Sequence, residues 1–159
     1  MDTITALTTI RDNLRSNLTD PFTLTSPAGV ARGGGYWVFC LEPVTAAKYP
    51  IIEIKKADNP TEVIDIGPDY MESERVFMNI FFYSKNGFRI TVATTTYLNE
   101  AFVEYYMGQI KAKLKSQFST LHTAGVGSYR HHNTSKVGYD PEGQLYFGFV
   151  TISVRFFHT

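Results

Sequence analysis

The sequence predicts an α+β domain: an antiparallel or mixed sheet with an N-terminal helix and a long second helix packed on it, joined by long polar loops. Two segments, residues 3–18 and 98–118, repeat apolar side chains at steps of three and four, the period of an amphipathic helix. The last long segment, residues 145–157, alternates as a strand does. Apolar runs lie between the two helices, a segregated order that is typical of α+β domains.

The first helix is predicted over residues 3–18, with Asp2 or Thr3 as its N-cap. Its apolar stripe contains Ile4, Leu7, Ile10, Leu14 and Leu18. The next segment, residues 19–35, is rich in Thr, Pro and Gly, so we expect a flexible arm. Three glycines at residues 33–35 lack the Lys-Ser/Thr that follows the glycines of a P-loop, and they predict a hinge rather than a phosphate site.

Apolar runs between the helices predict strands. These runs cover residues 36–41, 51–55, 63–66, 75–84 and 88–94. An Asp-Asn-Pro turn at residues 58–60 returns the chain from the second run to the third. Asn86 and Gly87 separate the last two runs. Asn-Gly between apolar runs predicts a hairpin, with both turn residues at positive φ.

The second helix is predicted over residues 98–118, with Thr96 or Asn99 as its cap. Its apolar stripe contains Leu98, Phe102, Tyr105, Tyr106, Ile110, Leu114 and Phe118. The polar segment at residues 122–144 is expected to be a second flexible loop. The chain length fits one domain, residues 1–159.

The closing strand, residues 145–157, is expected to lie inside the sheet because it is long and apolar. One side carries Tyr146, Val150, Ile152, Val154 and Phe156, and the other carries Phe147, Phe149, Thr151, Ser153 and Arg155. Phe77, Phe81 and Tyr83 join Phe147 and Phe149 in a second apolar face. This face is expected either to contact another subunit or to be covered by the first helix.

Composition limits the possible classes of function. Fifteen basic residues balance fifteen acidic ones, so no global basic field favours nonspecific nucleic-acid binding. Cys40 is the single cysteine, which excludes an internal disulfide, and its apolar surroundings predict burial. No apolar run approaches the ~20 residues of a membrane span, and the first residues lack signal-peptide features. We expect a cytoplasmic folding environment.

Candidate chemistry is sparse. No serine lies in a G-x-S-x-G pattern, so we expect no enzymatic activity, no catalytic residues and no cofactor. His122, His131 and His132 are the cluster that could bind metal. Adjacent histidines point in different directions in an extended chain and no cysteine lies nearby, so a solvated or interface loop is the preferred interpretation.

Contact residues are predicted in both flexible segments. A basic and aromatic group is suited to a protein contact or a nucleic-acid contact, and it contains Tyr129, Arg130, His131, His132 and Lys136. Arg32 in the 19–35 arm is a further candidate. Limited proteolysis is expected to cut first near Arg32 or Arg130.

Taken together, the element order resembles that of the tail terminator (tail-completion) proteins of long-tailed bacteriophages. The features that carry the resemblance are the 3–18 helix, a Pro-led strand at residues 49–54 (Y-P-I-I-E-I), the 75–94 hairpin, the 98–118 helix and a closing strand that begins at residues 143–146 (G-Q-L-Y). The 19–35 arm and the 36–41 strand are longer than in the simplest members.

The resemblance implies a virion structural protein at the head–tail interface, assembled in the host cytoplasm. Its copies would form a ring, usually a hexamer, that caps the tail tube, stops its polymerisation and joins the tail to the head connector. Its partners would be its own copies, the tail-tube protein and the head–tail connector protein, with DNA only as cargo through the ring and no membrane. The alternatives are another head–tail connector or tail-tube subunit and, in a different class, a small α+β enzyme or ligand-binding domain with a site near His122, His131 and His132.

Overall fold

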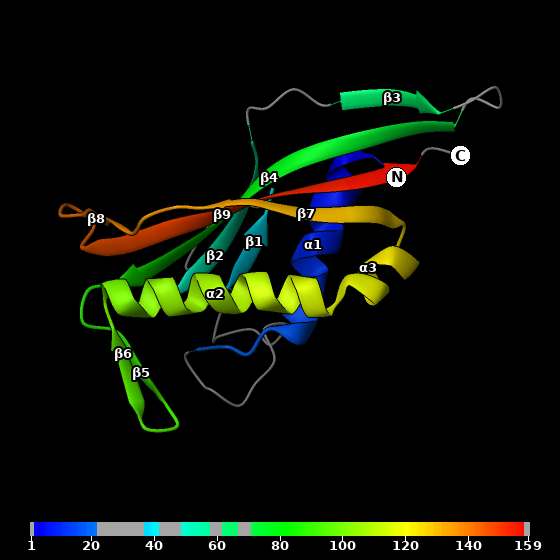
Figure 1. The fold of residues 1–159 in the computed structure, drawn as a ribbon. Helices are drawn as coiled ribbons and strands as arrows, with labels where there is room; N and C mark the ends of the chain where they lie inside the picture. Colours follow the sequence, from blue (N-terminus) through cyan, green and yellow to red (C-terminus); the bar gives the residue numbers. More distant parts are fainter. Residues whose placement is uncertain (1, 22–36, 42–48, 58–61, 67–70, 158–159) are drawn as a thin grey trace.

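A computed structural model describes residues 2–21, 37–41, 49–57, 62–66 and 71–157, with the backbone alone for 62–66, 71 and 72 (Figure 1). The elements are α1 (Thr3–Asn17), β1 (Val38–Cys40), β2 (Ile51–Lys56), β3 (Glu62–Ile66), β4 (Met71–Lys85), β5 (Arg89–Val92), β6 (Thr95–Leu98), α2 (Glu100–Ser116), α3 (Phe118–Thr123), β7 (Val126–Thr134), β8 (Gly138–Asp140) and β9 (Leu145–Phe157). The α+β class with a mixed sheet is confirmed.

The main sheet is built around the pairing of β4 with β9. Its strand order is β1-β2-β4-β9-β7, with β3 also paired to β4 and β8 to β9. The β1–β2 pair is parallel and the other pairs are antiparallel. All 13 residues of β9 pair with β4, from Leu145 opposite Lys85 to Phe157 opposite Ser73. Because β7 and β8 take its other edge, β9 is the interior strand that the sequence predicts.

Both long helices lie on one face of the sheet (Figure 1). Asp2 caps α1 by accepting a hydrogen bond from the Thr5 N–H at 2.7 Å, and this bond lowers the pKa of Asp2. Thr3 Oγ1 donates to Glu74 Oε1 at 3.1 Å, and Glu74 lies on the same side of β4 as buried Val76. The interpretation that the first helix covers the second apolar face is therefore wrong.

The core lies between this face and the two helices. Its fully enclosed side chains include Leu7, Ile10 and Leu14 of α1, Phe102, Val103 and Ile110 of α2, Val76, Met78, Ile80 and Phe82 of β4, and Val150, Ile152, Val154 and Phe156 of β9. Helix α2 approaches β9 closely at Gly148, where a Cβ atom would lie 2.5 Å from Met107 Sδ. Cys40 is buried in β1, as expected. None of the helices in the described ranges is long and apolar enough to cross a membrane.

The predicted 75–94 hairpin is wrong. The turn exists, with Phe88 N donating to Lys85 O at 3.2 Å and Gly87 at a φ of 85°. Asn86, however, has a negative φ. Positive φ at the second central residue alone is the pattern of a type II turn, which splays the flanking strands. Strand β5 instead pairs with β6 in a separate two-stranded sheet, which projects from the start of α2 (Figure 1).

The polar segment at residues 122–144 is not a long loop, which corrects the second prediction. It holds the end of α3 and the strands β7 and β8, both paired with β9. Strand β7 is polar because it lies at the sheet edge and turns alternate side chains to solvent. Register shifts between Val126 and Ser128 and between His131 and Asn133 further obscure its period.

Several predictions fall outside the described residues. These are Arg32, the 58–60 turn and all of the 19–35 arm beyond residue 21. The strand predicted at 63–66 is present as β3, but it pairs with the first part of β4 and not with β2. The second helix begins at Glu100, because Leu98 belongs to β6, and ends at Ser116 before Phe118 opens α3.

Candidate functional site

The candidate site is the sheet face that points away from α1 and α2, which we call the open face. Strand alternation places every second residue there, opposite the buried residues of the core. Its members are Glu53 and Lys55 of β2, Arg75, Phe77, Asn79, Phe81 and Tyr83 of β4, Phe147, Phe149, Thr151, Ser153 and Arg155 of β9, and Arg130 and His132 of β7. No helix in the described ranges covers this face.

Four half-buried aromatic rings lie against one another on the open face and form what we call the aromatic band: Phe81, Tyr83, Phe147 and Phe149. The ring centroids of Phe81 and Phe149 are 5.2 Å apart, and those of Phe81 and Tyr83 are 5.9 Å apart. The Phe147 ring covers Gly138 of β8, where a Cβ atom would lie 2.7 Å from it. The band is thus a continuous apolar surface built on two strands, β4 and β9, and its Phe147 ring also covers β8.

One border of the aromatic band is polar. Tyr83 OH donates to Glu53 Oε2 at 3.5 Å, and Lys55 Nζ pairs with the same carboxylate at 3.2 Å. Burial, and then the Glu53 carboxylate, raise the pKa of Tyr83 to about 12. Tyr83 therefore keeps its proton at neutral pH and remains a hydrogen-bond donor.

The other border carries His132. Its ring lies 5.1 Å from that of Phe77, and its Nε2 contacts Ser153 Oγ at 2.7 Å. Burial lowers the pKa of His132, and the nearby Arg130 and Arg75 lower it further. A neutral imidazole at neutral pH suits packing on Phe77, since a charged ring would lie beside two cations.

The structure brings together six of the residues singled out from the sequence. Phe77, Phe81, Phe147, Phe149, Arg130 and His132 all lie on the open face. Lys136 is exposed in the connection between β7 and β8, beside Ser135, whose Oγ accepts from Phe149 N at 2.8 Å. Arg32 lies outside the described residues.

Tyr129 and His131 face the helices and not the open face. Tyr129 is opposite buried Val154 and packs against the core, and its burial raises the pKa of its hydroxyl to about 12. His131 contacts Thr134 Oγ1 through Nε2 at 2.9 Å. Its pKa is lowered by burial and then by Lys111 of α2. Alternation along β7 therefore splits the predicted basic and aromatic group between two faces.

The three histidines do not converge on one point. His122 contacts Val126 O through Nδ1 at 3.2 Å at the end of α3, while His131 and His132 point to opposite faces of β7. Among the described residues no group of three or more His, Cys, Asp or Glu side chains is placed to hold a metal ion.

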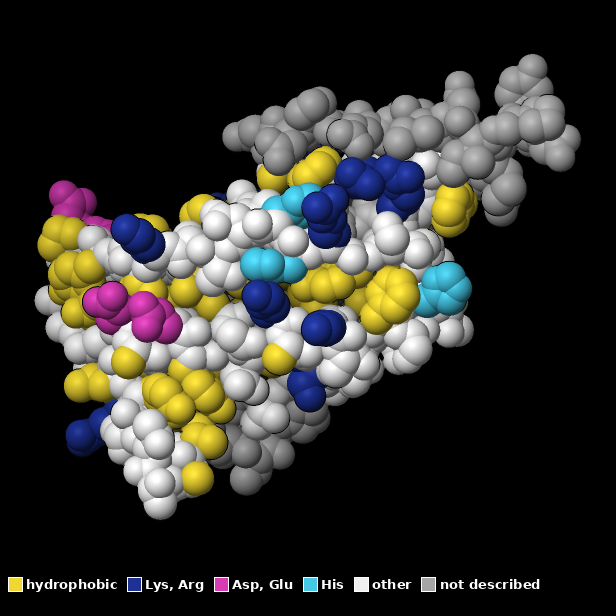
Figure 2. Space-filling view, viewed as in Figure 1, with side chains coloured by type: hydrophobic (Ala, Val, Ile, Leu, Met, Phe, Trp, Pro, Cys, Tyr) yellow, Lys and Arg dark blue, Asp and Glu magenta, His cyan; other side chains and the backbone are white. Residues whose placement is uncertain are grey.

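Arg75 and Arg155 belong to the open face and were not singled out from the sequence. They lie directly opposite each other on β4 and β9, and Arg130 lies opposite Ser153 on β7. The alternation of residues 145–157 does place Arg155 on the same side of the strand as Phe147 and Phe149. Its partner on the neighbouring strand depends on the register, which that pattern does not give. Figure 2 shows Lys and Arg side chains gathered over the β7 region and Asp and Glu at the opposite end.

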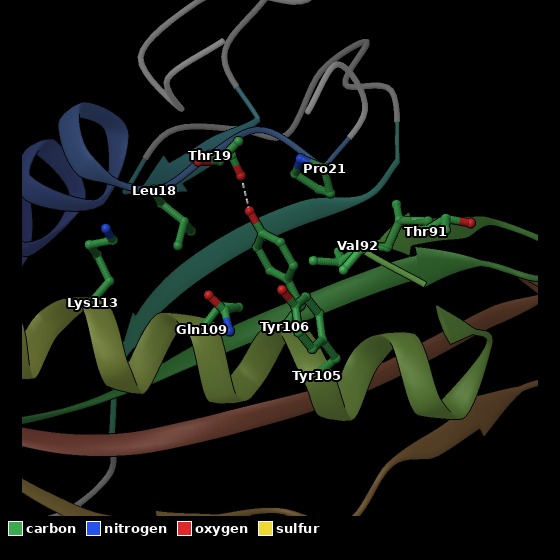
Figure 3. Close-up of a pocket in the computed structure, with 11 residues that line it drawn as sticks. Leu18, Thr19, Pro21, Thr91, Val92, Tyr105, Tyr106, Gln109 and Lys113 are labelled. Carbon is green, nitrogen blue, oxygen red and sulfur yellow. Dashed lines mark hydrogen bonds between the residues drawn. The ribbon is translucent and has the colours of Figure 1, made fainter. Parts of the chain in front are cut away.

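A pocket of about 380 Å³ lies elsewhere, between the end of α1, the β5–β6 hairpin and α2 (Figure 3). Tyr106 OH donates to Thr19 O across it, and Tyr105, Gln109 and Lys113 line its α2 side. The described lining residues include no carboxylate, histidine or cysteine. They offer hydrogen bonds and apolar contact, but no pair of groups for acid–base catalysis.

Comparison of the chain with protein-family models found no matching family, and comparison with curated proteins found no matching sequence.

Proposed function

We propose that this protein is a ring-forming tail terminator of a long-tailed bacteriophage, which caps the tail tube, stops its polymerisation and joins the tail to the head connector. The observation that carries the proposal is the aromatic band on a sheet face without a covering helix in the described ranges. A ring subunit needs lateral surfaces, and aromatic and Arg side chains are enriched where protein surfaces meet.

The order of elements supports the same proposal. Helix α1, the Pro-led strand β2, helix α2 and the closing strand β9 follow the order on which the resemblance rests. The predicted 75–94 hairpin is not part of this match, because β5 pairs with β6 and not with β4. The partners proposed are other copies of the chain, usually six to a ring, the tail-tube protein and the connector protein, with DNA passing through as cargo inside the virion.

The test is removal of the gene from the virus. Loss of a terminator should give unattached heads and tails of irregular, often excessive length, seen by electron microscopy. Normal tails joined to heads in the deletion would refute the proposal.

Complementation with variants then tests the open face. Phe81→Glu places a charge in the aromatic band and should fail to restore tail length. Phe118→Glu, on α3 and 37% exposed, is the matched control and should restore it. Replacing Tyr129 and Arg130 together by alanine would be less informative, because Tyr129 packs against the core. Equal rescue by the two Phe variants would show that the open face is not part of the ring contact.

A further inference from the structure

The chain is neutral as a whole, but its charges are segregated along the sequence. Residues 105–139 contain five Lys and Arg residues and no Asp or Glu, so the rest of the chain carries ten basic and fifteen acidic residues. This stretch forms the second half of α2, α3, β7 and the connection to β8, and both helices contact β7. On the face shown in Figure 2, Lys and Arg side chains lie over this part of the fold. Overall neutrality therefore does not exclude a local basic surface.

The centre of this surface is the exposed side of α2, which we call the lysine stripe: Gly108, Lys111, Ala112 and Lys115. These residues follow steps of three and four, so they lie on one side of the helix, and all four are exposed. A Cβ atom at Gly108 would have no neighbour within 4 Å, so the described residues leave this side of the helix uncovered. Two small residues thus lie between two long cationic side chains, and a chain of anionic groups can lie against the helix within reach of both ammonium groups.

The two lysines of the stripe have no anionic partner among the described residues. Neither forms an ion pair there, and the acidic residues of the same helix, Glu100 and Glu104, lie at least seven residues before Lys111. Asp12, on the neighbouring helix α1, already pairs with Arg11 at 2.8 Å. The positive charge of the stripe is therefore not compensated within this part of the fold.

Lys111 and Lys115 also repel each other, because like charges four residues apart on a helix are neighbours and destabilise it. The helix dipole favours Lys115, which is in the last turn, but its effect does not extend to Lys111. His131 of β7 lies close to the pair, and its pKa is lowered by burial and then by the charge of Lys111. A polyanion relieves this repulsion, whereas a neutral partner does not.

We propose that the lysine stripe binds the phosphate backbone of double-stranded DNA without reading its sequence. Each strand of a duplex carries one phosphate for about every 3.4 Å of its axis, and the two lysines are about one helical turn apart, so each can reach a phosphate of the same strand. The stripe carries no aromatic side chain on which an unpaired base would stack, which favours a duplex over a single strand.

An anionic membrane is the less favoured partner. The apolar side chains of α2, among them Phe102, Ile110 and Leu114, are enclosed in the core, so the helix has no apolar side free to insert into lipid. The inference goes beyond the proposed function, in which DNA is cargo only, because it makes DNA a ligand of α2.

The test is fluorescence anisotropy with purified full-length protein and a labelled duplex of about 20 base pairs at about 50 mM salt. Wild-type protein should bind two duplexes of unrelated sequence equally well, and its affinity should fall steeply with added salt. Lys111→Gln combined with Lys115→Gln should weaken binding at least about tenfold and reduce the slope of log affinity against log salt by about 1.8. Lys111→Arg combined with Lys115→Arg keeps both charges and should bind like the wild type.

Lys56→Gln combined with Arg89→Gln is the matched control, because it removes the same number of charges at two exposed positions outside α2. This control should bind DNA like the wild type, and melting temperatures should show that all the double variants are folded. Absence of binding by the wild type at low salt, an equal loss in the two Gln variants, or a salt slope that the lysine substitutions leave unchanged would each overturn the inference.

Vesicles that contain phosphatidylserine provide the remaining comparison. Binding of the wild type to these vesicles but not to DNA would also overturn the inference, and would assign the lysine stripe to a membrane. The gene deletion tests the proposed function separately, since it is scored by tail length and not by DNA binding.

Discussion

Gly148→Ala is expected to destabilise the fold, although alanine suits a strand better than glycine does. The new Cβ would lie 2.5 Å from Met107 Sδ and 2.7 Å from its Cε. Carbon and sulfur atoms in ordinary contact are about 3.5–4.0 Å apart, so Met107 would have to move by about 1 Å. Met107 is 2% exposed, so its thioether end would have to turn within the core and not into solvent. Overpacking of this kind lowers the free energy of unfolding by about 1–3 kcal/mol. Replacing glycine by alanine in a strand offsets up to about 1 kcal/mol of that loss.

The assay is a double-mutant cycle with Met107→Ala, using urea denaturation to give the free energy of unfolding of each protein. Met107→Ala alone should cost about 2–5 kcal/mol through lost burial and a cavity. In that background Gly148→Ala should be neutral or stabilising, because the added methyl group enters the space left by Met107. The coupling free energy should be about 1–3 kcal/mol. Additive effects would show that α2 is not held against β9 at this point.

Three further predictions concern a turn, the core and pH. Gly87 and Gly108 both have open space where a Cβ would be, but Gly87 has a φ of 85° while Gly108 lies in α2. Gly87→Ala should therefore lower the free energy of unfolding by about 1 kcal/mol and Gly108→Ala should raise it by a similar amount; effects of the same sign would contradict the turn geometry. Ile152→Asp places a carboxylate at a position with 0% exposure and should cost several kcal/mol, so soluble protein with an unchanged melting temperature would show that β9 is not interior. The pKa of His132 is lowered from its ordinary value of 6.5, so below pH 6.5 the unfolded chain binds more protons than the folded protein, and the free energy of unfolding should fall as the pH drops through 6.5. Urea denaturation at a series of pH values should show a smaller fall for His132→Gln than for the wild type. An identical fall in the two proteins would mean that another group titrates.

The elements predicted correctly from the sequence are those whose period is local. The stripes of α1 and α2 and the alternation of β9 each bury one side, as the period requires. The exceptions lie at the ends of the predicted stripes, where Ile4, Leu98 and Phe118 are exposed.

Strand β7 was not predicted because neither of its sides is apolar. Arg130 and His132 lie on the open face, and Tyr129 and His131 lie on the side that faces the helices. Two register shifts also break the alternation.

The failed hairpin has a different cause. Asn86 and Gly87 do turn the chain, but the 15 residues of β4 gain more by pairing with the 13 residues of β9 than by pairing with the short run at residues 88–94. The two possible partners of β4 are far apart in the chain, and a local sequence pattern cannot show which of them pairs more favourably. The juxtaposition of Arg75 and Arg155 was not predicted for the same reason, because it is set by the register of β4 and β9. The sequence predicts early tryptic cleavage near Arg130, but the structure predicts that this cleavage is slow in the folded protein, since Arg130 lies in a paired strand.

The side chain of Asn99 fastens the two ends of the β5–β6 hairpin together. Asn99 occupies the N-cap position of α2, but its Oδ1 accepts from Gly87 N at 2.8 Å and makes no capping bond. The base of the hairpin is anchored further by buried Ile90 and by Tyr97, whose ring stacks on that of Tyr105 at 4.2 Å. The tip around Ala93 is exposed and makes no contribution to this closure. The base of the β5–β6 hairpin is thus held in place independently of its tip. The tip can therefore be lengthened, trimmed or replaced by a foreign epitope without disturbing the junction between β4 and α2.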